Sequence, residues 1–277
     1  ASWSWSIFIV YFWGMTSANI STSRLLGNLR APQIAHALNN TAIIVQPLGA
    51  IEQHGPHLPL NTDLVIADAV ASAAVEKVGE ELNAWLLPPL AVTKSNEHAW
   101  SPGTIWLTTD TLLRVLDDIG RCIAMTGAER LVFLNGHGGN SSLVSVANRE
   151  LRLKYGLKTF LAHPGLPADQ GGLSPENELG MGVHAGTDET SIMLYLRPDL
   201  VDMSLAVRRI PEKLAANKHV KFGGSVSFGW MSNDFNEEGF VGDPTVANAE
   251  LGKTLFDGAV DNFCSALREI AAFNFGK

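Results

Sequence analysis

The feature that most constrains the fold is a repeated pairing of a short apolar run with a polar loop that contains glycine and histidine. Residues 42–50, AIIVQPLGA, are rich in β-branched side chains and stop at Gly49, where the segment EQHGPHLPLNTD follows at once. Residues 130–140, RLVFLNGHGGN, repeat this arrangement. Each run predicts a buried strand that delivers a polar loop, and open α/β sheets bind ligands beyond the carboxyl ends of their strands.

The segments between these strands predict an alternating α/β chain. Helical spacing of apolar residues, with alanines and valines along one face in the first case, predicts helices over 64–83, 109–127, about 140–156 and about 247–272. Further strands are predicted at LLPPLAV (86–92) and KTFLAHPG (158–165). Asp63 stands in an N-cap-like place, and Glu189 falls in the first turn of a helix that Thr187 or Asp188 caps. The βαβα order favours a mostly parallel sheet.

The remaining segments carry no internal repeat and no linker that would divide the chain. Residues 166–182 predict a long irregular loop, and residues 205–245 are rich in glycine and poor in strands. We therefore expect one domain over 15–277. Residues 1–14, ASWSWSIFIVYFWG, are interpreted as an N-terminal extension or an artefact of preparation, since Met15 is a more natural start. A membrane anchor is the weaker alternative, because a bilayer span needs about 20 residues.

Charge and cysteine content narrow the class of function. The chain has a formal charge of -8 and no runs of lysine or arginine, which argues against a nucleic-acid partner and for a small-molecule substrate. Cys122 and Cys264 lie far apart without a CxxC partner, so neither a disulfide framework nor a zinc ribbon is expected. A cytoplasmic protein without a membrane partner fits best.

Five side chains in the predicted loops have the chemistry of metal ligands. Glu52 and His54 are two residues apart, so in an extended segment both point into one cavity. Asp63 has two oxygens with which to bridge two ions, His137 follows a strand between two glycines, and Glu189 adds a carboxylate. Such a mixed N/O set suits a pair of divalent ions about 4 Å apart.

Other polar and aromatic residues permit a functional or a structural reading. His57 is expected to support a ligand rather than to bind metal. Glu97 and His98 either line the site or stabilise their own loop. Trp100, Trp106 and Trp230 either belong to the core or an interface or wall a pocket, and Asp117 and Asp118 are expected on a solvated helix surface.

Five segments in this order resemble the creatininase, or creatinine amidohydrolase, family. They are PLGAIEQHGPHLPLNTD (47–63), SNEHAWSPGT (95–104), FLNGHGGNSS (133–142), HAGTDETS (184–191) and GFVGDPTVANAELG (239–252). The resemblance implies a three-layer α/β/α fold around a parallel sheet, a hexameric assembly and a binuclear centre filled by zinc before manganese or iron. It also implies that Glu52 holds one metal, that His54 and His137 hold the other, that Asp63 bridges them and that Glu189 completes the set.

The implied reaction is hydrolysis of a C–N amide bond through a metal-bridging hydroxide, in a cyclic amide, a formamide or a related small molecule rather than an ordinary peptide bond. Creatinine itself is a doubtful substrate, because creatininases have NGHYEN with a metal-binding Glu where this chain has Gly138 and Gly139. The alternatives are a deformylase or a peptidase of a cofactor pathway, or a catalytically silent metal-binding assembly protein.

His184 is the first candidate for the proton donor to the leaving nitrogen, because it precedes Glu189 by five residues in the same loop. Glu97 and His98 are the reserve candidates. Ser95, Trp100 and Gly138 are expected to contact the substrate.

Overall fold

A four-stranded parallel sheet forms the centre of the protein. The structure is a computed structural model, and it describes residues 24–165 and 176–276. The strands are β1 (Ile43–Leu48), β2 (Ala84–Leu86), β3 (Arg130–Asn135) and β4 (Lys158–Ala162), in the order β2-β1-β3-β4. The helices are α1 (Ala31–Ala37), α2 (Thr62–Leu82), α3 (Thr109–Ala124), α4 (Ser141–Tyr155), α5 (Thr187–Leu196), α6 (Glu212–Ala215) and α7 (Ala249–Ala272).

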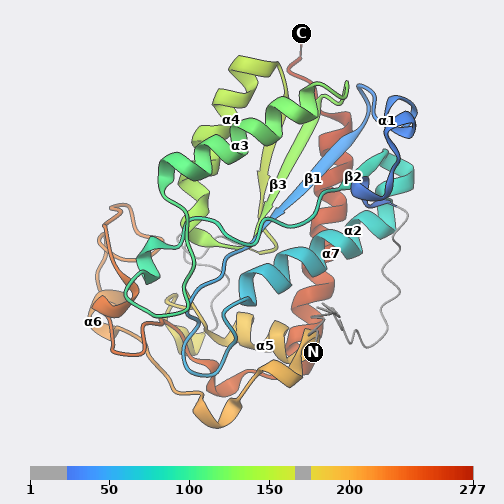
Figure 1. Cartoon of the computed structure of the whole chain (residues 1–277). Coiled ribbons are helices and arrows are strands. Elements are labelled where there is room, and N and C mark those ends of the chain that lie inside the picture. The colour runs from blue at the N-terminus through green and yellow to red at the C-terminus, as the bar shows by residue number, and fades with distance from the viewer. Residues whose placement is uncertain (1–23, 166–175, 277) are drawn as a thin grey trace, which may run out of the picture.

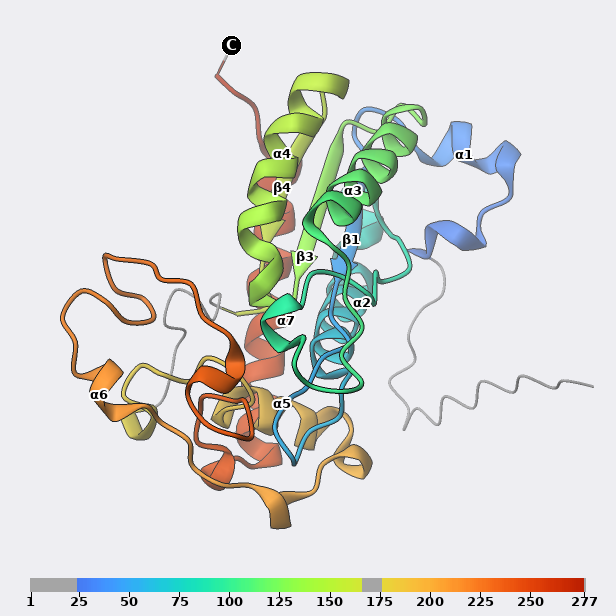
Figure 2. The same ribbon diagram turned by 60° about the vertical axis from the view of Figure 1, so that its left-hand side comes forward.

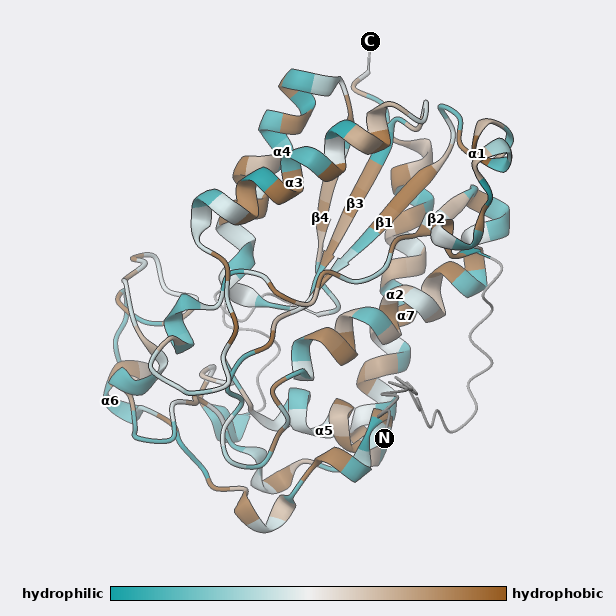
Figure 3. Cartoon of the chain, in the orientation of Figure 1, coloured by the Kyte–Doolittle hydropathy of each residue, from teal (hydrophilic) through white to brown (hydrophobic). Residues whose placement is uncertain are grey.

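Helices cover both faces of this sheet and make three layers. Figures 1 and 2 show α3 and α4 on one face and α2 and α7 on the other. Val70 of α2 and Phe263 of α7 pack with Val132 of the sheet, whereas Leu116 of α3 and Leu151 of α4 are in the core cluster of the opposite face. The strands are brown over much of their length in Figure 3, as expected for strands buried on both faces. The predicted three-layer α/β/α fold is confirmed.

The predicted strands and helices are found close to their expected bounds, with two differences. The strand expected at 86–92 is wrong in position: β2 ends at Leu86, because Pro88 and Pro89 have no N–H to donate to a sheet ladder. Asp63 is not the N-cap of α2, since Asn61 has that position and Asp63 lies in the first helical turn. The predicted extension, residues 1–14, lies outside the described residues, as do residues 166–175 of the predicted loop.

The strand order creates a crevice between β1 and β3. The chain leaves β1 through α2, which covers one face, and enters β3 from α3, which covers the other face. The two strands are in parallel register, with Leu48 opposite Asn135, so their following loops begin side by side. This is the topological switch point at which open α/β sheets bind ligands.

Two glycines let helix α2 start directly against this crevice. A side chain on Gly49 would lie 2.5 Å from the Leu64 Cα, and one on Gly136 would lie 2.8 Å from the carbonyl oxygen of Asp63. The first turn of α2 therefore packs against the ends of β1 and β3. The absence of these two side chains brings the carboxylate of Asp63 to the switch point.

A third close approach positions α5, which carries Glu189. A Cβ on Gly252 of α7 would overlap the carbonyl oxygen of Ser191 in α5. The same pair of helices is joined by a hydrogen bond from the Asn248 backbone N–H to the Ser191 hydroxyl at 3.2 Å and by a Tyr195–Phe256 ring contact at 5.7 Å. Helix α7 therefore holds α5 at short range through a glycine.

Replacing Gly252 with alanine is expected to destabilise the protein by about 1–3 kcal/mol, because the added methyl group forces α5 and α7 apart. Chemical denaturation measures this change. Gly258→Ala is the matched control: Gly258 lies in the same helix, is exposed and has open space where an added methyl group would lie, so alanine should stabilise the helix by up to about 1 kcal/mol. Equal effects of the two changes would contradict the close approach of the helices.

Candidate metal centre

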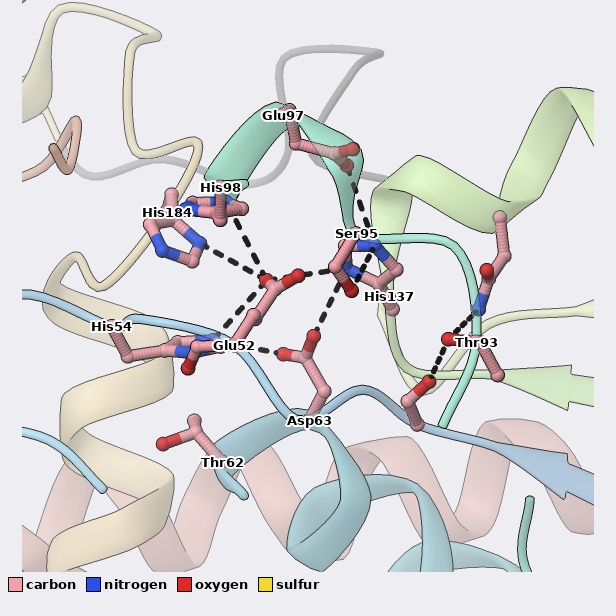
Figure 4. A network of polar contacts seen from close by, with 12 residues as sticks. Glu52, His54, Thr62, Asp63, Thr93, Ser95, Glu97, His98, His137 and His184 are labelled. Atoms are coloured by element: carbon pink, nitrogen blue, oxygen red, sulfur yellow. Dashed lines mark hydrogen bonds and ion pairs between the residues drawn. The ribbon is translucent and has the colours of Figure 1, made fainter. Parts of the chain in front are cut away.

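Four carboxylates and four imidazoles converge beyond the carboxyl ends of β1 and β3. Figure 4 shows seven of these side chains pointing toward one another from separate loops and from the first turn of α2. The eight residues are Glu52, Asp63, Glu97, Glu189, His54, His98, His137 and His184. Donor atoms of seven of them, all but His98, form three groups in which every atom lies within 4.8 Å of the others, namely Glu52–His54–His184, Glu52–Glu97–His137 and His54–Asp63–Glu189.

Glu52 lies at the centre of the cluster. Its Oε1 lies 3.3 Å from His137 Nδ1, 3.6 Å from His98 Nε2, 3.7 Å from His184 Nδ1 and 3.9 Å from His54 Nε2. The side chain is 1% exposed, and within the described residues no hydrogen-bond donor reaches its Oε2. A buried carboxylate oxygen without a donor is costly unless a cation compensates it.

Asp63 lies between two imidazoles. One of its oxygens is 3.0 Å from His54 Nε2 and the other is 3.0 Å from His137 Nδ1. This geometry has the form of a bridge between two positions. Among the donor groups, His137 lies with Glu52 and Glu97, while His54 lies with Asp63 and Glu189 and also with Glu52 and His184.

Each of the four imidazoles is held from behind by a carbonyl oxygen. His54 Nδ1 lies 3.1 Å from the Glu52 carbonyl, His137 Nε2 lies 2.7 Å from the Lys94 carbonyl, and His184 Nε2 lies 2.6 Å from the Gln53 carbonyl. His98 Nδ1 lies 3.2 Å from the Gln53 side-chain oxygen. A carbonyl oxygen only accepts, so in the neutral ring the outer nitrogen carries the hydrogen and the inner nitrogen presents its lone pair.

This arrangement is typical of metal-binding histidines, whose second ring nitrogen is bonded to a carbonyl or carboxylate. The residues fit divalent cations in two further respects. The four carboxylates, of which Glu52, Asp63 and Glu97 are buried, carry the formal charge that two divalent cations would neutralise, and imidazole with carboxylate is a ligand set that zinc, manganese and iron accept.

The pKa values of several side chains in the cluster are shifted far from their ordinary values. Burial disfavours the charged form of His54, but the charges of Asp63, Glu189 and Glu52 outweigh it and raise the pKa of His54 to about 10. Burial, together with the charges of Asp63 and Glu52, raises the pKa of Glu189 to about 7 despite the opposing charge of His54. Burial keeps the pKa of His184 well below, and that of His98 below, the ordinary histidine value.

Gln53 is a site residue that the sequence reasoning missed. It lies between Glu52 and His54, is 8% exposed, and its backbone and side-chain oxygens hold His184 and His98 respectively. Its side-chain nitrogen donates to the carbonyl of Glu238, which fixes the amide so that the oxygen faces His98. The extended spacing that put Glu52 and His54 on one side directs Gln53 to the other, where it supports the histidines.

The cluster opens into a cavity of about 900 Å³. Seven of the eight clustered residues, all but His54, line it, and Gly138, Trp230 and His163 are also in its wall. His163 follows β4 and accepts from or donates to the Ser141 hydroxyl at 3.2 Å, while burial lowers the pKa of its ring to about 4. Its position directly after a strand, as for His137, is the sequence signal that could have identified it.

Several expected residues lie elsewhere. Ser95 is fully buried with its hydroxyl 3.5 Å from His137 Nε2, and Trp100 donates to the Ser232 hydroxyl at 2.6 Å, so neither forms part of the cavity wall. Trp106 is 40% exposed and also lies outside it. His57 Nε2 lies 2.9 Å from the Thr190 hydroxyl, behind the cluster, which suits a supporting role.

Comparison with known proteins identifies the family. The family described as "Creatininase: Creatinine amidohydrolase" matches residues 27–267, which is most of the chain. The chain belongs to the creatininase family. The resemblance of the five segments is thereby confirmed, and the protein is a creatininase-family amidohydrolase.

Two relatives are similar in sequence to this chain over more than half of its length. The mycofactocin precursor peptide peptidase of Mycobacterium ulcerans is 34% identical over 251 residues, which cover 88% of this chain and 91% of that protein. The creatinine amidohydrolase of Pseudomonas putida is 36% identical over 185 residues, covering 61% and 70%.

Solved creatininase structures share the fold. A creatininase with Mn superposes with a TM-score of 0.67 at 28% identity over 89% of this chain and 98% of that one. A mutant creatininase of Zn-Zn type gives 0.65 at 26% identity over 88% and 97%. Among the helices of the described residues, none combines the length and apolar character that a membrane crossing requires.

Replacing Gln53 with methionine is expected to lower kcat about 10- to 100-fold with little change in KM, because the His98 ring loses the acceptor that fixes its tautomer. Steady-state kinetics measure kcat and KM separately. His184 retains its bond to the backbone oxygen at residue 53, so the effect should pass through His98 alone. The double variant Gln53→Met/His98→Ala should therefore be no slower than His98→Ala, and additive losses would contradict this role.

Metal binding is expected to release protons at pH 7. The pKa of His54 lies near 10 in the side-chain cluster, and imidazole binds a cation only in its neutral form, so binding must displace its proton. Affinity should accordingly fall as the pH falls, because protons then compete more strongly. Titration calorimetry in buffers of different ionisation enthalpy measures the released protons, and heats independent of the buffer would be inconsistent with this assignment.

Proposed function

We propose that the protein is a divalent-metal amidohydrolase with two ions, and that it hydrolyses an amide bond in a short peptide. The supporting observation is the convergence of four carboxylates, three of them buried, with four imidazoles whose outer nitrogens are all bonded to carbonyl oxygens. Zinc is the first candidate for both positions, with manganese or iron as alternatives.

The geometry suggests a division of the ligands between the two ions. Glu52 and His137 would hold one ion, His54 and Glu189 would hold the other, and Asp63 would bridge them with its two oxygens. When bound, such a pair of ions lowers the pKa of a water molecule toward neutrality and polarises a substrate carbonyl.

His184 and His98 are suited to move the proton between the attacking water and the leaving nitrogen. Both rings stay neutral because burial lowers their pKa values, and both present an inner nitrogen with a free lone pair toward Glu52. They therefore act first as proton acceptors. His184, the donor expected from the sequence, would gain the proton on Nδ1 and then deliver it to the amine as C–N cleavage proceeds.

A peptide suits the space beside the cluster better than a small ring does. The cavity of about 900 Å³ is far larger than a five-membered ring needs, and its wall includes the apolar side chains of Leu143, Val183, Phe228 and Trp230. The similarity to a mycofactocin precursor peptide peptidase over 88% of the chain supports the same substrate class. The substrate class expected from the sequence, an amide other than an ordinary peptide bond, is the second candidate.

Assembly and location remain predictions. A hexamer is expected from the family resemblance, and a single domain is expected over 15–277. Cys122 and Cys264 are both free, and a cytoplasmic location stays a prediction.

Hydrolysis of short peptides is expected to stop on removal of metal by a chelator and to return when zinc or manganese is added. Formamides and cyclic ureides, including creatinine, should be tested beside the peptides in the same assay. Asp63→Asn should lower kcat/KM about a thousandfold or more, equivalent to about 4 kcal/mol of transition-state stabilisation, because it removes the bridging charge.

Asp118→Asn is the matched control, since this side chain is 70% exposed on α3 and, within the part of the chain that the structure describes, forms one ion pair, at the surface with Arg121. It should retain full activity. Hydrolysis that persists after metal removal would overturn the metal-dependent function, whereas metal-dependent turnover of formamides or ureides alone would overturn the peptide substrate. Bound metal without turnover of any of these compounds would favour the catalytically silent alternative.

A further inference from the structure

Glu97 has a position in the cluster that neither the two-ion scheme above nor its expected role as a reserve proton donor explains. It belongs to a short 3-10 turn, Asn96–His98, that lies over the loop after β3. Its side chain is 11% exposed, and within the described residues no hydrogen-bond donor reaches its Oε2, which has only the Lys94 ammonium at 3.7 Å. A buried carboxylate in this state needs a cation closer than Lys94.

Gly139 provides the space that this carboxylate occupies. A Cβ on Gly139 would overlap the Glu97 Oε1 and the His137 Nε2, so any residue other than glycine would displace the carboxylate. The glycine is not required by its backbone angles, since it is absent from the residues with positive φ. Its missing side chain is therefore matched to Glu97.

The segment that leads into the turn, Thr93 and Lys94, is fastened to the same loop by two hydrogen bonds to Asn140. The Lys94 N–H donates to the Asn140 side-chain oxygen at 3.1 Å, and the Asn140 side-chain nitrogen donates to the Thr93 hydroxyl at 3.1 Å. These bonds fix the height of the turn above Gly139. The carboxylate of Glu97 is thus placed by both loops.

Orienting His137 is not a sufficient role for Glu97. The Nε2–H of His137 already donates to the Lys94 carbonyl at 2.7 Å, whereas the Glu97 oxygen is more distant at 3.3 Å. One N–H group needs one good acceptor, and the carbonyl supplies it. The carboxylate is left with its position in the donor group Glu52–Glu97–His137.

We infer that Glu97 is a further metal ligand, which completes the Glu52–His137 position from a separate loop, and that Gly139 is required to admit it. The inference rests on the proposed two-ion function. It gives the first ion two carboxylates and an imidazole in addition to the shared Asp63, a ligand set of the mixed N/O kind that divalent transition metals accept.

The test measures metal content and affinity in the whole protein. Wild type, Glu97→Gln, Gly139→Ala and the double variant are loaded with zinc, dialysed against a weak chelator and analysed for zinc per chain. Cobalt-loaded samples report the coordination through their visible absorption. Asp188→Asn is the matched control, because Asp188 lines the same cavity but belongs to none of the three donor groups.

Wild type and Asp188→Asn should each retain two ions per chain. Glu97→Gln should retain one ion per chain. Its affinity for metal at the Glu52–His137 position should fall by more than the roughly 10- to 100-fold that loss of an outer hydrogen bond costs. Gly139→Ala should lose at least as much, because its methyl group would meet His137 Nε2 as well as the Glu97 carboxylate, and the two losses should be less than additive in the double variant.

Two ions in Glu97→Gln, with affinity and cobalt spectrum unchanged, would overturn the inference while leaving the proposed function intact. A wild-type protein that does not bind two ions would contradict the proposed function itself, and the inference with it. Since glutamine has nearly the shape of glutamate, Glu97→Gln alone decides the question if Gly139→Ala does not fold.

Discussion

Four carboxylates repel one another in one largely buried cluster, and the rest of the structure depends on how this repulsion is compensated. Glu52, Asp63 and Glu97 are each at most 8% exposed, and Glu189 is close enough for Asp63 and Glu52 to raise its pKa. Like charges at this range in a region of low dielectric are strongly unfavourable. Protonation of the histidines, or cations between the carboxylates, can compensate them. The carbonyl oxygens behind all four imidazoles are compatible with both solutions: each fixes the hydrogen on the outer nitrogen, and the inner nitrogen then either carries a proton or binds a cation.

Close backbone approach is the means by which the fold assembles this cluster. Gly49 and Gly136 let the first turn of α2 contact the ends of β1 and β3, and Gly252 lets α7 hold α5. Because each of these glycines lacks a side chain, the backbone of one element lies directly against the backbone of its neighbour. The candidate ligands therefore come from the ends of several elements, but their donor atoms lie within a few ångströms of one another. Small displacements of α2 or α5 would separate Asp63 or Glu189 from the rest.

The shared fold does not determine the substrate. This chain has relatives named for peptide processing and for creatinine hydrolysis, and its core architecture agrees with solved creatininases. In the proposed function, the cluster would supply the hydrolytic chemistry and the surrounding wall would select the substrate. In this protein that wall includes aromatic residues of the segment 227–230, and the loop after His137 has two glycines where creatininases carry larger side chains.

Local patterns in the sequence were sufficient for the sheet and for most of the candidate ligands. The apolar runs at β1 and β3 are long and bounded by glycine, so their strands were predictable, and side chains two apart after a strand placed Glu52 and His54 together. The strand predicted at LLPPLAV (86–92) was wrong in position, because hydrophobicity alone does not account for the missing N–H groups of Pro88 and Pro89.

Only the tertiary structure decided which donors share a position. The pairing of His137 with Glu52, the support of two histidines by Gln53 and the fit of Glu97 over Gly139 all join segments from different loops. No periodicity in the chain encodes such contacts, because they depend on the distance between loops that the packing of α2, α5 and α7 sets. The sequence by itself determined which groups are available for the chemistry, and the packing of the helices against the sheet determined where their donor atoms meet.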